Sequence, residues 1–134
     1  MRYDPQDRDD NLVLLMDSIS EIESGDANKF IVAGSHCSQN VPRYALSMPL
    51  RGAVFNDAGI GKDNAGVSSL GALSAAGLPA AAVSHDTARI GDARDVYENG
   101  ILSTVNELAA GIGAAPGMSV AEFVELLLHA RDRD

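Results

Sequence analysis

The apolar positions of the chain fall into short runs that end in polar, glycine-rich loops. Three of these runs read as buried strands, at 29–34 (KFIVAG), 51–57 (RGAVFND) and 79–85 (PAAAVSH). Continuous apolar runs of this length, bounded by turn residues, are typical of strands buried on both faces of a parallel sheet. The stretches between them, 40–49 and 65–77, predict helices. Pro42 lies early in the first, where a missing N–H is tolerated, and Gly77 ends the second.

Two other segments are expected to be helical. Residues 96–113 carry apolar side chains at helical spacing, and 119–132 form a last helix that Ser119 and Glu122 open as a capping box. Residues 12–24 leave two interpretations. Their apolar spacing and Gly25 favour a helix, whereas LVLLM could equally be a buried strand that ends at Asp17. We favour the helix.

Apolar strands that alternate with helices predict an α/β fold. We expect a small three-layer domain with a mostly parallel sheet of three or four strands, right-handed crossovers and helices on both faces. The 134 residues are enough for one domain, spanning 1–134, in which 1–10 form a flexible polar arm.

Charge and composition narrow the choice of partners. A net charge of −9 and an aromatic content of 4% disfavour nucleic acid and anionic membranes. The acids are concentrated in residues 1–26, whereas 51–95 are nearly balanced, so an anionic ligand of the middle region is compatible with the overall charge. We also expect a homo-oligomer, because the small-residue helix at 65–77 can pack closely against a second subunit.

Cellular location follows from what the sequence lacks. Cys37 is the single cysteine, which excludes an internal disulfide. No apolar run approaches the ~20 residues that span a bilayer. The first ten residues have no apolar core of the kind found in signal peptides. We therefore expect a cytoplasmic protein with no membrane partner.

Reactive side chains follow each of the three predicted strands. They are Ser35, His36 and Cys37 after the first, Asn56 and Asp57 after the second, and Ser84, His85 and Asp86 after the third. The carboxyl ends of parallel strands meet at one edge of a sheet, where α/β proteins bind ligands. Asn, Asp and Ser also favour turns for local reasons, but two of the three histidines stand at equivalent strand ends. The third, His129, is expected to face solvent.

These residue types suggest acid–base chemistry. His36 and His85 are the candidate acid and base, and Asp57 and Asp86 would orient the imidazoles. Cys37, Ser35 and Ser84 are candidate nucleophiles, with His85 as the better-placed base for Cys37. We expect no cofactor. The alternative of a divalent metal held by His36, His85, Asp57 and Asp86 stays open, although no compact ligand motif supports it.

The loop at 56–66 (NDAGIGKDNAG) is a candidate anion site. Gly59 and Gly61 would expose backbone N–H groups, Lys62 would add a charge, and Asp63 and Asn64 would line the site or cap the next helix. The loop is neither a Walker A motif, because Asp63 follows the lysine, nor a G-x-G-x-x-G fingerprint. Arg89, in the loop after the third strand, could hold a carboxylate or pair with Asp86 or Asp92.

The sequence therefore predicts an enzyme, a hydrolase or isomerase, that acts on a small carboxylate or phosphate at the carboxyl edge of the sheet. Two alternatives stay open. One is a binding module that uses the same pocket without turnover. The other is a structural protein whose role is oligomerisation. A phosphoacceptor receiver domain is excluded, because the acids that it requires are missing after the first and third strands.

Overall fold

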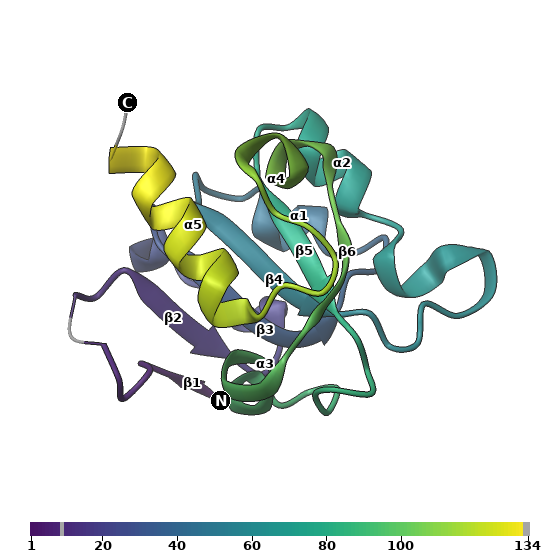
Figure 1. Ribbon diagram of the computed structural model, residues 1–134. Coiled ribbons are helices and arrows are strands. Elements are labelled where there is room, and N and C mark those ends of the chain that lie inside the picture. Colours follow the sequence, from purple (N-terminus) through teal and green to yellow (C-terminus); the bar gives the residue numbers. More distant parts are fainter. Residues whose placement is uncertain (9, 133–134) are drawn as a thin grey trace.

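The protein is an α/β domain built on a six-stranded, mostly parallel sheet, seen in a computed structural model that describes residues 1–8 and 10–132. The strands lie side by side in chain order, from β1 at one edge to β6 at the other (Figure 1). β2 to β5 run parallel, and the two edge strands are antiparallel to their neighbours. The strands are β1 Arg2–Tyr3, β2 Val13–Met16, β3 Phe30–His36, β4 Gly52–Asn56, β5 Ala80–Val83 and β6 Leu102–Val105.

Helices pack on both faces of the sheet, and each face has its own cluster of buried apolar residues. The α-helices are α1 Pro42–Ala45, α2 Leu70–Ala75, α3 Ala93–Asn99, α4 Glu107–Ile112 and α5 Val120–Asp132. Three short 3-10 helices span Ile19–Glu21, Ser24–Asp26 and Lys62–Val67. Phe30 of β3 joins the cluster under α3 and α5, whereas its neighbour Ile31 joins the cluster under α1 and α2. Figure 1 shows α5 crossing the front of the sheet.

The paths of the chain after β4 and β5 diverge at the carboxyl edge. From β4 the chain turns to the face that α2 covers, and from β5 it turns to the face that α3 covers. The β3–α1–β4 and β4–α2–β5 crossovers have the same handedness and step in the same direction across the sheet. Their helices, α1 and α2, must therefore lie on the same face. Where connections from neighbouring strands part to opposite faces, open α/β sheets leave room for a ligand. The fold therefore singles out the ends of β4 and β5.

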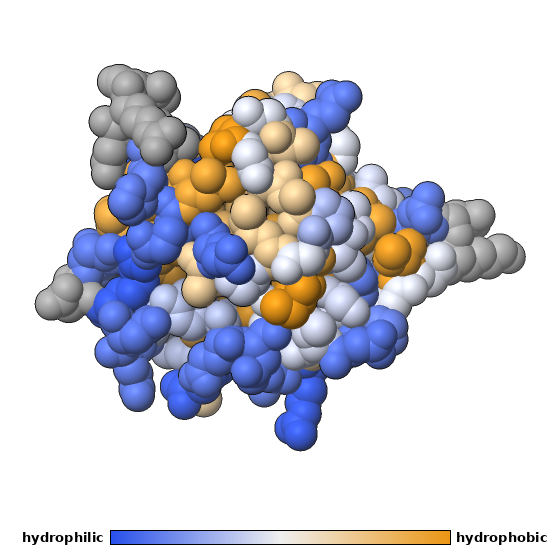
Figure 2. Space-filling view, viewed as in Figure 1, coloured by the Kyte–Doolittle hydropathy of each residue, from blue (hydrophilic) through white to orange (hydrophobic). Residues whose placement is uncertain are grey.

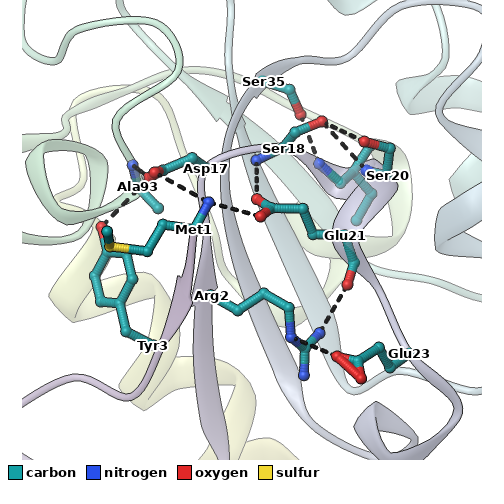
Figure 3. Close-up of polar contacts among 11 residues, drawn as sticks. Met1, Arg2, Tyr3, Asp17, Ser18, Ser20, Glu21, Glu23, Ser35 and Ala93 are labelled. Atoms are coloured by element: carbon teal, nitrogen blue, oxygen red, sulfur yellow. Dashed lines mark hydrogen bonds and ion pairs between the residues drawn. The ribbon is translucent and has the colours of Figure 1, made fainter.

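The sheet is larger than the predicted three or four strands, because β1 and β6 were not expected and β2 was only the alternative interpretation of residues 12–24. Residues 2–3, predicted to lie in a flexible arm, form β1. The Arg2 guanidinium makes two hydrogen bonds to Asp26, of 2.6 and 3.0 Å, and also contacts Glu23. Figure 3 shows Met1 and Arg2 beside the polar side chains of the turn after β2. The Met1 amine lies 2.6 Å from Glu21 Oε1. These contacts hold the segment against β2.

The predicted helix at 12–24 is wrong, and the alternative strand is present as β2. All four residues of β2 are buried, because the strand lies between β1 and β3 and is covered on both faces. Ser18 then caps the 3-10 helix Ile19–Glu21 through its side chain. The helical spacing of the apolar residues in this segment is coincidental.

The single helix predicted for 96–113 is also wrong, since the segment forms the end of α3, then β6, then α4. A Cβ on Gly100 would lie 2.7 Å from Val83 and 3.1 Å from Val120, so the chain turns there without room for a side chain. Asn106 begins α4, where its side chain accepts a hydrogen bond of 3.0 Å from the N–H of Ala109. The residues between them, LSTV, continue the sheet as β6.

The other predicted elements are present. The three predicted strands are β3, β4 and β5, and the predicted helix at 40–49 is reduced to the single turn α1 with Pro42 at its start. The stretch 65–77 contains the end of a 3-10 helix and α2. Ser119 and Glu122 exchange hydrogen bonds of 3.1 and 3.2 Å at the start of α5, which confirms the capping box.

Hydrophobic residues reach the surface over the region of α5 and α4, with hydrophilic residues around them (Figure 2). A shallow groove there has a volume of about 560 Å³ and is lined by Met118, Ala121, Glu122, Glu125, Leu126 and His129. Among residues 1–8 and 10–132, no helix is long and apolar enough to cross a bilayer.

Candidate functional site

Asp57 and His85 form the centre of the candidate site. Asp57 directly follows β4 and its carboxylate is buried, whereas the imidazole of His85, two residues beyond β5, is 53% exposed. Asp57 Oδ1 lies 3.6 Å from His85 Nδ1. A buried carboxylate beside an accessible imidazole is the arrangement that orients a histidine for proton transfer.

Three donors hold the Asp57 carboxylate in place. Oδ1 accepts hydrogen bonds from the backbone N–H of Gly59 at 2.7 Å and of His85 at 3.0 Å. Oδ2 accepts a short bond of 2.5 Å from the hydroxyl of Ser103 on β6. The carboxylate therefore connects the loop after β4, the loop after β5 and the edge strand β6, and donors from all three segments fix its position.

The other two sides of the imidazole face Gly59 and Asp86. A Cβ on Gly59 would lie 3.5–3.7 Å from three ring atoms, so the ring lies over Gly59 with room for no more than a methyl group between them. Asp86 Oδ1 lies 3.3 Å from Nε2, and its side chain is 81% exposed. His85 thus has a fixed, buried carboxylate near one ring nitrogen and a solvent-exposed one near the other.

The loop after β4 is tightly folded on itself. Ala58, Gly59, Ile60 and Gly61 all have positive φ, from 53° to 76°. This conformation is strained for alanine and especially for the β-branched Ile60. Asn56 contributes to holding it, because its Oδ1 accepts from Ala58 N at 2.8 Å while its Nδ2 donates to the carbonyl of Ala88 at 2.9 Å. The buried Asn56 thereby ties this loop to the loop after β5.

The backbone N–H groups of residues 58–61, predicted to bind an anion, already have hydrogen-bond acceptors in the structure. The four N–H groups of this stretch donate within the turn, to the side chains of Asn56 and Asp57 and to the carbonyls of Asp57 and Gly59. The side chains of Lys62 and Asp63 lie outside the described residues. Asn64, with φ 59°, is exposed.

His36 lies at the same edge as His85 but not beside it. It ends β3, is exposed and pairs in register with Asn56 of β4. Because β4 separates β3 from β5 and neighbouring strands are about 4.8 Å apart, the two histidine backbones are at least roughly 10 Å apart. The two histidines therefore lie on opposite sides of the end of β4.

Ser35 and Ser84 have structural roles. The Ser35 hydroxyl accepts a hydrogen bond of 3.1 Å from the N–H of Ile19. The Ser84 hydroxyl accepts one of 3.2 Å from the N–H of Asp86, and the Ser84 carbonyl accepts from the hydroxyl of Thr87. The Ser84 contacts are typical of a turn-forming serine, whereas the Ser35 contact joins β3 to the turn after β2.

Cys37 is fully buried, and this burial raises the pKa of its thiol to about 12. Only the thiolate is an effective nucleophile, so a thiol with this pKa stays protonated and inert at neutral pH. We leave Cys37 out of the proposed mechanism for this reason.

Arg89 lies in the loop before α3, and its backbone N–H donates to Asp95 at 2.8 Å. The hydrogen bonds from the Asn99 side chain and from Arg89 N lower the pKa of the Asp95 carboxylate, and the charge of the Arg89 guanidinium lowers it further. Arg89 lines a cavity of about 260 Å³ together with residues of α3 and the turn before it. His129, on α5, is exposed and lies 3.2 Å from Glu125.

Ser103 is the site residue that the sequence did not indicate. Its segment was predicted to be helical, and only the strand β6 brings its hydroxyl to Asp57. Among the described residues, no group of three or more His, Cys, Asp or Glu side chains is arranged to hold a metal ion. A separate cleft of about 260 Å³ lies between residues 3–7 and α3, and none of the predicted site residues line it.

Comparison with known proteins adds no relative. No protein-family model matches the chain, and no significant match was found among curated proteins or among solved structures. The geometry at the ends of β4 and β5 is therefore the basis for assigning a function.

Proposed function

We propose that the protein is an enzyme that uses His85 as acid and base on a small anionic molecule bound over the carboxyl ends of β3, β4 and β5. The observation that carries the proposal is the buried Asp57 carboxylate, held by three donors, 3.6 Å from Nδ1 of an accessible imidazole. Such a carboxylate stabilises the imidazolium that forms when Nε2 takes a proton from the substrate.

Hydrolysis or isomerisation fits this arrangement. In either reaction, His85 Nε2 would remove a proton from water or from the substrate and return it later to the leaving group or to a neighbouring atom. His36, across the end of β4, would serve the opposite end of the substrate. Lys62 is the proposed source of positive charge for the anionic group, whereas Arg89, predicted for the same role, lines the cavity beside α3. A divalent metal at His36, His85, Asp57 and Asp86 is the alternative, and no metal-holding group among the described residues favours it.

A thermal-shift screen tests whether the site binds a small molecule. The panel contains small carboxylates, phosphorylated metabolites and divalent metals with and without chelator. A ligand at 100 times its dissociation constant stabilises the protein by about 2.7 kcal/mol, which is readily measured. We expect a carboxylate or phosphate to stabilise the wild type and His129→Gln but not Asp57→Ala tested at a temperature where it is folded. If no compound stabilises the wild type, the proposal loses its basis.

The alternative function is a binding module that never turns its ligand over. Replacing both His36 and His85 by alanine separates the two functions. An enzyme keeps much of its affinity and loses its rate, whereas a binding module loses affinity and has no rate to lose. The expected homo-oligomer is also a proposal, and a monomer mass that does not change with concentration in light scattering would contradict it.

A further inference from the structure

The Asp86 carboxylate occupies the position from which an anionic substrate would reach His85. Its Oδ1 lies 3.3 Å from Nε2, which is the ring nitrogen on the side away from the buried Asp57. Nε2 is also the nitrogen to which the proposed function assigns proton transfer. A substrate and Asp86 therefore compete for the same atom.

The Asp86 side chain can leave this position at little cost. It is 81% exposed, and an exposed pair of this kind contributes little to stability. Its backbone is fixed independently, because the N–H of Asp86 donates to the Ser84 hydroxyl. Rotation of the side chain would uncover Nε2 without moving the loop.

We infer that Asp86 is a displaceable internal occupant of an anion subsite at His85, and that the substrate group that replaces it is a carboxylate. This inference depends on the proposed function, because it assigns the substrate class of the same site. Asp86 itself shows the kind of group that the imidazole accepts there, which is a planar group with a single negative charge.

The fixed charge of Asp57 favours a carboxylate over a phosphate. Asp57 faces His85 across the ring, and it is held in place by Gly59, His85 and Ser103. A phosphate carries about 1.5 to 2 negative charges at neutral pH, so it meets more repulsion from this fixed carboxylate than a monoanion does. We expect a monocarboxylate to bind more tightly than inorganic phosphate.

NMR of the histidine side chains tests this inference with simple probes. Sodium acetate and sodium phosphate are titrated into the labelled full chain at constant ionic strength, and the imidazole signals of His36, His85 and His129 are followed. His85→Gln assigns the His85 signals. Acetate is expected to shift these signals with saturation, and His129 serves as the unaffected reference.

The variant Asp86→Asn removes the competing charge while keeping the size of the side chain. Its dissociation constant for acetate is expected to be about two- to fivefold lower than that of the wild type, as the loss of a weak exposed competitor requires. Glu98→Gln removes one exposed negative charge from α3 and is the matched control. Acetate affinity should be unchanged in this control.

Three results would overturn the inference. Equal acetate affinity in the wild type and in Asp86→Asn would show that Asp86 is not a competitor, and the proposed function would stand. An equal gain in Glu98→Gln would assign the effect to net charge alone. If acetate moves no His85 signal in any variant, the anion subsite is absent, and the anionic substrate class of the proposed function fails with it.

Discussion

His85 contacts one carboxylate oxygen of Asp57 in two ways, through its backbone and through its ring. The backbone N–H donates to Asp57 Oδ1 at 3.0 Å, and Nδ1 of the imidazole lies 3.6 Å from the same oxygen. The loop after β5 and the orientation of the imidazole therefore depend on a single buried group. This relationship links the stability of the carboxyl edge to its proposed chemistry.

Asp57→Ala should therefore destabilise the protein by about 2–4 kcal/mol. The substitution leaves the partly buried N–H groups of Gly59 and His85 and the hydroxyl of Ser103 without their acceptor, and a donor left unpaired costs about 1–3 kcal/mol when it is buried. Urea unfolding measures the change. Asp86→Ala is the control, since its exposed side chain should contribute about 0.5 kcal/mol or less. Equal losses in the two variants would contradict the role given to Asp57.

Gly34→Ala should destabilise the protein strongly, because β3 passes directly under the loop that leads to α3. A Cβ on Gly34 would lie 2.5–2.9 Å from backbone atoms of Asp92, Gly91 and Asp17. Overpacking of this kind costs about 1–3 kcal/mol or more. The matched control is Gly25→Ala, where nothing lies within 4 Å and little change is expected. Thermal unfolding of both variants makes the comparison, and a neutral Gly34→Ala would contradict the packing.

The Cys37 thiol should be unreactive in the native protein. With its pKa raised to about 12 by burial, roughly one thiol in ten thousand is ionised at pH 8. A thiol-specific chromogenic reagent should therefore react only after denaturant is added. Rapid reaction of the folded protein would contradict the burial and would return Cys37 to the list of candidate nucleophiles.

Acid should remove the stabilisation that Asp26 provides. The hydrogen bonds from Arg2 lower the pKa of this buried carboxyl below its ordinary value of 3.8. Because the folded pKa is the lower one, the stabilisation is complete above the ordinary pKa and is lost as the pH falls through the folded value. The free energy of unfolding should fall less steeply below pH 4 in Asp26→Asn than in the wild type. Parallel curves would show that Asp26 does not contribute.

The sequence predicted three of the four strands that are buried on both faces of the sheet. β3, β4 and β5 are continuous apolar runs that end in polar residues, so their positions and the place of His85 and Asp57 could be anticipated. A contact between Asp57 or Asp86 and an imidazole was predicted too. That both carboxylates lie beside the same imidazole, that of His85, was not predicted, because it depends on the paths of the two loops, on which sequence periodicity carries no information.

The missed strands have physical reasons as well. β2 has four buried residues whose apolar neighbours happen to repeat at helical spacing, and β6 lies between two short helices whose apolar residues are in phase. The role of Ser103 was hidden with β6. The prediction of an anion site at Gly59 and Gly61 is wrong, because the Gly59 N–H donates to the Asp57 side chain and the Gly61 N–H donates to the Gly59 carbonyl.

The most direct test of the proposed site is the turnover of a ligand returned by the thermal-shift screen, compared between the wild type, His85→Gln and His129→Gln. General acid–base catalysis contributes about 10²- to 10⁴-fold to a rate. We predict that kcat falls by this factor in His85→Gln, while His129→Gln keeps the wild-type rate. A rate that is unchanged in His85→Gln, or that falls equally in both variants, would contradict the assignment of the active site to His85 and Asp57.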